Sequence, residues 1–232
     1  PAVLFVPTAR SGPRPSSPPP LQVGAAVRAL LRERPLRLVT TGYLGHMWEL
    51  FALWAWLPAF FIASRSAVNS VEPGVTKAGV IAFAAIGVAG LAGAVAAGRL
   101  ADRIGRTTTT SGAMLVSAAC CLASPLAFAS STAVLVGVLL LWGSAVIADS
   151  AQFSAAVTEL AEPRYAGSIL ALQLALGFAL TVASIRLVPV VVDAVGWQYA
   201  LLPLAAGPLA GTAAMLRLRA SPAARRLASG RG

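Results

Sequence analysis

Apolar residues dominate six long stretches of the chain, and short polar segments separate these stretches. They lie at about 38–63, 78–98, 108–129, 132–157, 165–190 and 197–217. Each holds about 20 or more mostly apolar residues, which is enough for a helix to cross roughly 30 Å of hydrocarbon at about 1.5 Å per residue. The pattern predicts an all-α membrane protein, with a six-transmembrane-helix bundle at residues 38–217.

A shorter helical pattern precedes the first span. From Leu21 to Arg34, apolar residues recur at spacings of three and four, with arginines on the other side. We expect a basic amphipathic helix lying on the membrane surface, although targets of calmodulin-type partners share this pattern. The stretch before it, residues 1–20, opens with PAVLFV and then becomes Pro-rich, so it is either the end of a cut-off helix or a linker. Residues 1–37 are thus predicted to be a cytoplasmic linker with an amphipathic helix.

Basic residues predict the orientation of the spans. They stand before the first span and after the second, fourth and sixth (Arg28, Arg32, Arg34, Arg37; Arg99, Arg103, Arg106; Arg164; Arg217, Arg219, Arg225, Arg226), whereas the other side has Arg65 and Lys77. Positively charged loops stay in the cytoplasm. We therefore expect cytoplasmic ends, a basic cytoplasmic tail at 218–232, and external loops at about 64–77 and 191–196.

Composition and charge narrow the classes of protein. The chain is 57% hydrophobic and 11% charged, with a mean hydropathy of +0.78, which is too apolar for a soluble domain. The net charge of +10 could suggest nucleic acid, but no basic face alternates with aromatic residues, so we expect no nucleic-acid partner. Because the chain starts at Pro1 without a signal pattern, we expect a piece of a longer protein.

Polar side chains inside an apolar span need a reason, because burying them in hydrocarbon is costly. His46 and Glu49 lie one turn apart on the first span, and Glu49 lies roughly 16 Å from Leu38 along the helix, near mid-membrane. We expect Glu49 to carry a proton, with His46 as its hydrogen-bond partner. The alternative is a protonated glutamate that bonds to a neighbouring helix.

The later spans hold further polar side chains. Asp149 and Gln152 share one face of the fourth span, and Gln173 and Thr181 share a stripe of the fifth with Gly177 and Ser184. We expect these four polar residues and Arg186 to line a water-filled path for a solute. Arg186 could instead extend to the outer headgroups.

Enzymatic chemistry finds little support in the sequence. His46 is the only histidine, so the His-Glu-x-x-His pattern of a metalloprotease is absent, and no Gly-rich phosphate loop is present. Cys120 and Cys121 are adjacent, so their side chains diverge by about 100° on a helix and predict neither a disulfide nor a metal site. We expect no enzyme, cofactor or metal.

The charged turn between the second and third spans reads GRLADRIGR, residues 98–106. It resembles the signature Gly-x-Leu-Ala-Asp-Arg-x-Gly-Arg of the major facilitator superfamily (MFS), found in a cytoplasmic loop of each six-helix half. The matching residues are Gly98, Leu100, Asp102, Arg103, Gly105 and Arg106, whereas Thr107 departs from a common Lys or Arg.

Three further segments extend the resemblance over nearly all of residues 38–219. GYLGHMWELFALWAWLPAFF is similar to the first helix of a facilitator half, IADSAQFSAAVTELAEPRYAGS to its fourth helix and following loop, and DAVGWQYALLPLAAGPLAGTAAMLRLR to the final helix. The branch they suggest is the bacterial group related to cyanate and nitrate/nitrite transporters.

The resemblance implies secondary active transport of a small solute across an inner membrane by alternating access, with possible proton coupling. A complete member has twelve helices in two halves that enclose the solute site. We expect this chain to be the C-terminal half, with the lipid bilayer, the solute and the N-terminal half as partners. The resemblance also implies that the motif gates the cytoplasmic side, with Asp102 facing a helix N-terminus of the other half. The alternative is a transport-inactive membrane protein, either a sensor or a truncated half.

Overall fold

The computed structural model describes residues 22–68 and 74–230, and within these ranges the chain forms helices and no strands. The predicted linker at 1–20 and part of the predicted 64–77 loop lie outside them. The elements are α1 (Val23–Arg32), α2 (Arg34–Val68), α3 (Val75–Ala82), the π-helix η1 (Phe83–Ala89), α4 (Gly90–Ile104), α5 (Arg106–Phe128), α6 (Thr132–Ala148), α7 (Ser150–Leu160), α8 (Pro163–Val195), the 3₁₀ turns η2 (Trp197–Tyr199) and η3 (Leu202–Ala205), α9 (Ala206–Arg219), η4 (Pro222–Arg226) and η5 (Ala228–Gly230).

Six helical segments are long and apolar enough to cross a membrane, which confirms the predicted helical fold. They are Arg34–Val68, Val75–Ile104, Arg106–Phe128, Thr132–Leu160, Pro163–Val195 and Trp197–Arg219. Most extend beyond the apolar stretches in the sequence, because a helix satisfies its own backbone hydrogen bonds and can continue into polar surroundings. At one end, α8 therefore continues to Val195, so that the predicted 191–196 loop is reduced to a turn at Gly196.

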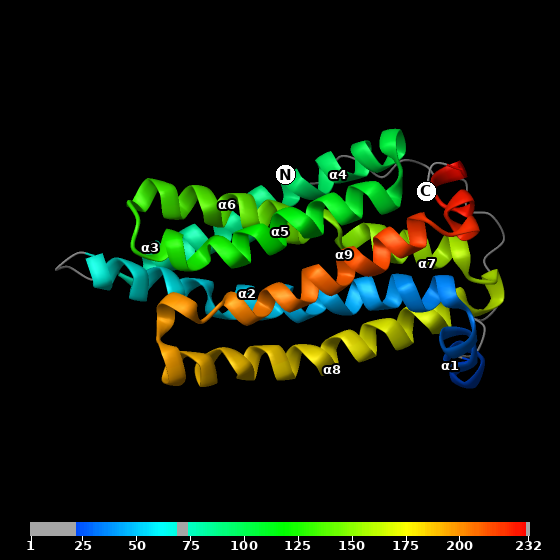
Figure 1. Cartoon of the computed structure of the whole chain (residues 1–232), viewed down its shortest axis with the longest axis horizontal. Helices are drawn as coiled ribbons and strands as arrows, with labels where there is room; N and C mark the ends of the chain where they lie inside the picture. The colour runs from blue at the N-terminus through cyan, green and yellow to red at the C-terminus, as the bar shows by residue number, and fades with distance from the viewer. Residues whose placement is uncertain (1–21, 69–73, 231–232) are drawn as a thin grey trace, which may run out of the picture.

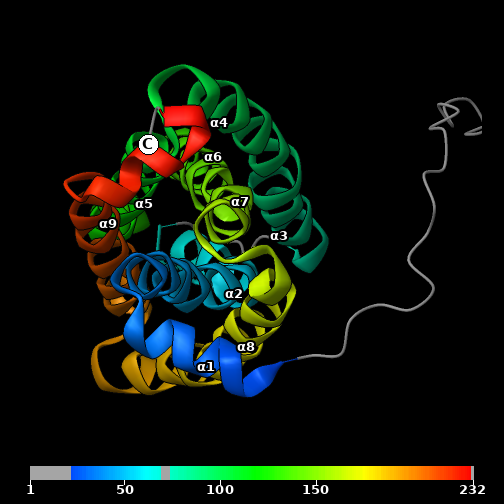
Figure 2. The ribbon, with the colours of Figure 1, turned by 90° about the vertical axis from the view of Figure 1, so that its right-hand side faces the viewer.

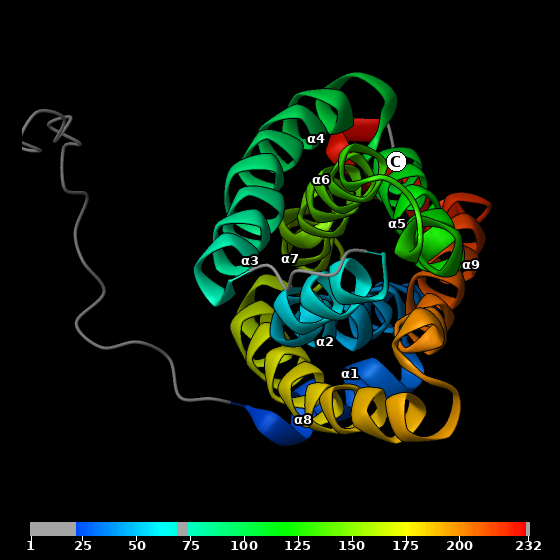
Figure 3. The same ribbon diagram turned by 90° about the vertical axis from the view of Figure 1, so that its left-hand side faces the viewer.

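The six segments run side by side along the long axis of the molecule (Figure 1). End-on views place α2 between α8 on one side and the pair α5 and α6 on the other (Figures 2 and 3). The most extensive helix contacts are those of α2 with α9 and α8, of α5 with α9, and of α6 with α4 and α5. The short helix α1 lies across one end of the bundle, where Ala26 and Leu30 are buried and the Gln22 amide donates to Ser168 Oγ of α8 at 2.9 Å.

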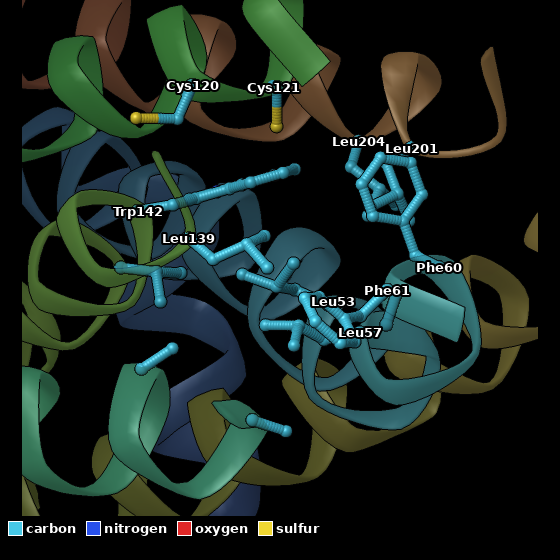
Figure 4. Close-up of a cluster of buried hydrophobic side chains, with 14 of the residues drawn as sticks. Leu53, Leu57, Phe60, Phe61, Cys120, Cys121, Leu139, Trp142, Leu201 and Leu204 are labelled. Carbon is cyan, nitrogen blue, oxygen red and sulfur yellow. The ribbon is translucent and has the colours of Figure 1, made fainter. Parts of the chain in front are cut away.

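The apolar core joins α2, α5, α6 and the turn before α9. Figure 4 shows this core, with side chains from α2 opposite those of the other elements (Leu53, Leu57, Phe60 and Phe61; Cys120 and Cys121; Leu139 and Trp142; Leu201 and Leu204). Lipid tails are as apolar as these side chains, so close packing, rather than removal of apolar surface from water, stabilises such an interior.

Glycine allows α2 and α9 to touch through their backbones. A Cβ atom on Gly45 would overlap the carbonyl oxygen of Gly207, and a Cβ atom on Gly207 would overlap that of Gly45. Gly211 packs in turn against Met114 of α5. Small residues at four-residue spacing thus bring helices together as expected within a membrane.

Arg65, near the end of α2, is buried and binds the turn between α5 and α6. Its guanidinium donates to the carbonyl oxygens of Phe128 at 3.0 Å and Ser130 at 2.9 Å, and to Thr132 Oγ1 at 3.2 Å. The carbonyl groups that end a helix carry partial negative charge and lack partners within the helix. The arginine therefore caps α5 from a neighbouring helix.

Candidate functional site

A close contact between two buried ionisable side chains, an ion pair when the imidazole is protonated, joins α2 to the junction of α6 and α7. His46 Nδ1 lies 2.8 Å from Asp149 Oδ1, and their side chains are 1% and 3% exposed. Asp149 is the one residue between α6 and α7, and so it sits where the fourth span is interrupted. Phe153 and Tyr43 pack around the imidazole, with ring centroids 5.8 Å and 6.2 Å from it. The imidazole and the carboxyl group thus share a buried site bordered by aromatic rings.

Glu49 occupies a second buried site, one helical turn from His46. Its Oε1 atom accepts hydrogen bonds from Trp142 Nε1 at 2.6 Å, Ser117 Oγ at 2.8 Å and Cys121 Sγ at 3.1 Å. Figure 4 shows Trp142 and Cys121 pointing into the same space. Three donors directed at one oxygen match the needs of a carboxylate, which accepts hydrogen bonds and donates none.

The expected hydrogen bond between His46 and Glu49 is wrong. His46 pairs with Asp149 instead, and Glu49 bonds to α5 and α6. Their spacing puts both residues on one side of α2. At His46 this side faces the junction of α6 and α7, and at Glu49 it faces α5 and α6. The sequence contains no signal for Ser117, Cys121 or Trp142, because they lie 68 to 93 residues from Glu49.

A third polar cluster surrounds Arg106, at the start of α5. The guanidinium donates through Nη2 and Nε to Glu159 Oε1 at 2.7 and 3.0 Å, and through Nη1 to Gln152 Oε1 at 2.9 Å. Glu159 Oε2 also accepts from the Ala228 amide at 3.0 Å, and Arg226 donates to the Leu160 carbonyl at 2.7 Å. Gln152 thus binds the charged turn rather than sharing a site with Asp149, and the C-terminal tail reaches the same cluster.

The remaining motif residues form the turn itself. Gly105 has φ 95° and ψ 154°, a conformation open to glycine and strained for other residues, and it separates α4 from α5. Leu100, Asp102 and Arg103 are exposed, whereas Gly98 has open space where a Cβ atom would stand. Arg106 thus links this turn to α7.

The polar stripe on α8 packs against α2. Gln173 and Thr181 are buried, Thr181 Oγ1 donates to the Phe178 carbonyl at 2.7 Å, and a Cβ atom on Gly177 would touch Tyr43 and Met47. Arg186, in contrast, is exposed on α8. The stripe therefore lies mostly within the packed helix interface.

Gln173 also lines a small cavity. This space of about 210 Å³ lies between α2, α7 and α8, and Tyr43, Ser154 and Leu170 line it as well. The Gln173 Nε2 atom is buried and has no hydrogen-bond partner in the described part of the chain. A buried amide without a partner costs free energy.

Within residues 22–68 and 74–230, no group of three His, Cys, Asp or Glu side chains lies close enough together to hold a metal ion. His46, Asp149 and Glu49 are instead ionisable side chains buried on the sides of membrane-spanning helices, in two neighbouring sites.

Comparison with known proteins identifies the family. No curated protein matches the chain, and the suggested cyanate and nitrate/nitrite branch stays a prediction. Residues 2–185, however, match the Major Facilitator Superfamily. That region holds the motif at 98–106 and all three polar clusters apart from the C-terminal tail. The family consists of membrane transporters and not of enzymes, in agreement with six spanning helices. The chain therefore belongs to the Major Facilitator Superfamily and is a multi-pass membrane protein of a solute-transporting family.

Proposed function

We propose that this chain takes part in proton-coupled secondary transport of a small solute by alternating access, with Glu49 and the His46–Asp149 pair as the proton-binding groups. The observation that carries the proposal is the burial of all three side chains inside the spans. Ionisable groups in the hydrocarbon are expensive, and well-packed apolar residues would usually stabilise the fold as well or better. A role in function gives a physical reason for their presence.

The position of Glu49 suits a proton carrier. It lies 15 residues after Arg34 on a helix of 35 residues, about 22 Å from the start of α2 at 1.5 Å per residue, and so near its middle. When protonated, the carboxyl group loses its charge and no longer needs all three donors of α5 and α6. Proton binding would thus change the strength of contacts between α2 and its neighbours, which is what coupling to a conformational change requires.

The cavity beside Gln173 is the proposed binding site of the solute. Its volume admits only a small molecule, and the Tyr43 and Ser154 hydroxyl groups beside it can donate hydrogen bonds. Tyr43 packs edge-on against Phe153, with ring centroids 6.1 Å apart, and Phe153 also touches His46. These rings provide a short packed connection between the cavity and the buried ion pair.

The cytoplasmic side of the proposed cycle involves the motif. Both ends of the chain, and hence the turn at 98–106, would face the cytoplasm across an inner membrane. Arg106 holds this turn against Glu159 and Gln152. Asp102 would face a helix N-terminus in an N-terminal six-helix half of the same protein, where the helix dipole favours a negative charge. Loss of that contact would favour opening on the cytoplasmic side. An Asp102→Asn variant of the full-length protein tests this contact, and unchanged inward and outward accessibility would contradict it.

Uptake into proteoliposomes tests the proton-binding role. The full-length protein would be assayed with a panel of small solutes, with and without an inward proton gradient. We expect Glu49→Gln to abolish gradient-driven accumulation while solute exchange across the membrane persists, because a glutamine cannot release a proton.

The matched control is Glu162→Gln, which makes the same chemical change at an exposed residue paired with Arg164. It should leave accumulation unchanged. Undiminished gradient-driven accumulation in Glu49→Gln would assign Glu49 a structural role instead.

A further inference from the structure

An open apolar groove runs along the outside of the bundle where α4 and α5 diverge. Its volume is about 460 Å³. Ala97, Leu100 and Ile104 of α4 form one wall and Gly112 of α5 the other, while α6 forms the floor through Leu141. The groove extends along α4 from Gly93 to Ile104, about 16 Å at 1.5 Å per residue.

Small residues explain why the groove exists. Farther from the charged turn, α4 packs tightly on α6, and a Cβ atom on Gly93 would overlap the backbone of Ser144. Nearer the turn, α5 presents Gly112, where a Cβ atom would meet no atom within 4 Å. No side chain therefore fills the space between the two helices. The groove lies within two spanning helices and is lined mostly by apolar atoms, so its occupant must be apolar over this length.

The chemistry changes at the end of the groove beside the turn. Thr108, in the first turn of α5, lines the groove there. The N-cap of this helix is Gly105, which has no side chain to bind the first-turn amides, and such amides lack partners within the helix. The N-terminus of a 23-residue helix, together with donors of this kind, favours an anion such as phosphate.

A basic side chain lies at the rim of that end of the groove. Arg103 is exposed on α4 and directly precedes the groove residue Ile104, whereas Arg99 lies about 120° from the groove-lining face at 100° per residue. Asp102 lies about 180° around the helix from the groove-lining face, given 100° per residue. The charge near the groove's end is therefore positive. Each basic residue at a membrane surface attracts anionic lipid with a modest energy.

We propose that this groove, here called the α4–α5 groove, binds a phospholipid with net negative charge. One acyl chain lies between α4 and α5, and the phosphate lies at the N-terminus of α5 beside Arg103. The lipid thereby fills the space between α4 and α5 next to the turn that carries the motif. This site is separate from the proton-binding groups and from the Gln173 cavity, and its existence does not depend on proton coupling.

Native mass spectrometry of the full-length protein tests the site. Delipidated protein would receive phosphatidylglycerol or phosphatidylethanolamine with identical acyl chains. We expect Gly112→Leu, whose side chain projects into the groove, to weaken phosphatidylglycerol binding about tenfold, a 1.4 kcal/mol change. Gly137→Leu on α6 is the matched control, since Gly137 is also exposed with open space around it but does not line the groove. Equal binding by the two leucine variants would overturn the proposal.

The headgroup contact has its own test. Arg103→Gln should reduce the preference for phosphatidylglycerol over phosphatidylethanolamine about fivefold, as expected for one basic residue near an anionic surface. An unchanged preference would contradict the role of Arg103. In a separate experiment, inorganic phosphate competes with the lipid. Full competition by phosphate would show that the site binds a free anion and would contradict a bound acyl chain.

A measurement on the unmodified protein guards against misfolded variants. Phosphatidylglycerol with a photoactivatable group in its acyl chain should label the groove residues Ala113 and Val116 in preference to Leu122, an exposed residue on another side of α5. Equal labelling of these positions would indicate unspecific lipid contact and would overturn the site.

Discussion

The buried pair of His46 and Asp149 should couple far more strongly than an exposed pair of the same length. The nitrogen–oxygen distance is 2.8 Å both in this pair and in that of Arg164 with Glu162. The side chains of the first pair are 1% and 3% exposed, and those of the second are 64% and 53% exposed. The two pairs therefore differ in burial and in the base, which is an imidazole in the first and a guanidinium in the second.

The expected magnitudes follow from this difference in burial. Removing one partner of a buried ion pair typically costs about 3–5 kcal/mol, because the other charge remains in the interior without compensation. An exposed pair contributes about 0–1 kcal/mol, since water already solvates both charges. We expect His46→Leu and Asp149→Leu each to fall in the first range, and their combination to cost about 2 kcal/mol less than the sum.

A double-mutant cycle measures this coupling. The free energy of unfolding would be determined for the full-length protein in mixed micelles, for both single variants and for the double variant. The cycle of Arg164→Ala with Glu162→Ala provides the control and should give a coupling of about 0–1 kcal/mol. A coupling near 0.6 kcal/mol at His46 and Asp149 would indicate an ordinary hydrogen bond within the membrane and would refute the ionic interpretation.

Three other predictions concern the clusters and the orientation. If Glu49 is a carboxylate, Trp142→Phe should cost about 1.5–3 kcal/mol of unfolding free energy, because a hydrogen bond to a charged group is lost. Trp56→Phe removes a bond to a neutral carbonyl and should cost about 0.5–1.5 kcal/mol, and equal losses would contradict the carboxylate form. Glu159→Gln weakens the hydrogen bond that Glu159 accepts from the Ala228 amide, so trypsin should cleave the C-terminal tail several-fold faster. An unchanged cleavage rate would show that this bond does not hold the tail in place. A cysteine introduced by Arg103→Cys should react with an impermeant reagent from the cytoplasmic side, and labelling only from outside would reverse the proposed topology.

The number and type of the helices could be predicted from the sequence because runs of apolar residues determine which segments cross a membrane. Their ends could not, since α2 and α8 continue as helices where hydropathy falls. The position of glycines along a helix does not give the packing either. Gly207 and Gly211 pack closely against neighbouring helices, whereas Gly98 has open space around it, because the sequence alone does not tell which face of a helix meets a neighbour.

The candidate site could be predicted in its residues but not in its connections. The cost of polar groups in hydrocarbon singled out His46, Glu49 and Asp149. Their partners depend on how distant segments pack, and periodicity within one helix contains no such information. Ser117 and Trp142 therefore came only from the three-dimensional structure, as did the contact of Arg106 with α7.

The capping of α5 by Arg65 has a mechanical consequence. A single guanidinium binds the carbonyl groups of Phe128 and Ser130 and the Thr132 hydroxyl group, so α2, α5 and α6 are joined at that end of the bundle. Closer to the charged turn, α2 is joined to α5 and α6 through Glu49 and to Asp149 through His46. These contacts depend on carboxyl and imidazole groups that can gain or lose a proton, whereas a guanidinium keeps its charge. We expect the three helices to behave like a hinge fixed at Arg65, with displacement growing toward the charged turn. Spin-label distances between α2 and α5 should then vary little near Arg65 and most near the charged turn. Uniform changes along the helices would rule out a hinge at Arg65.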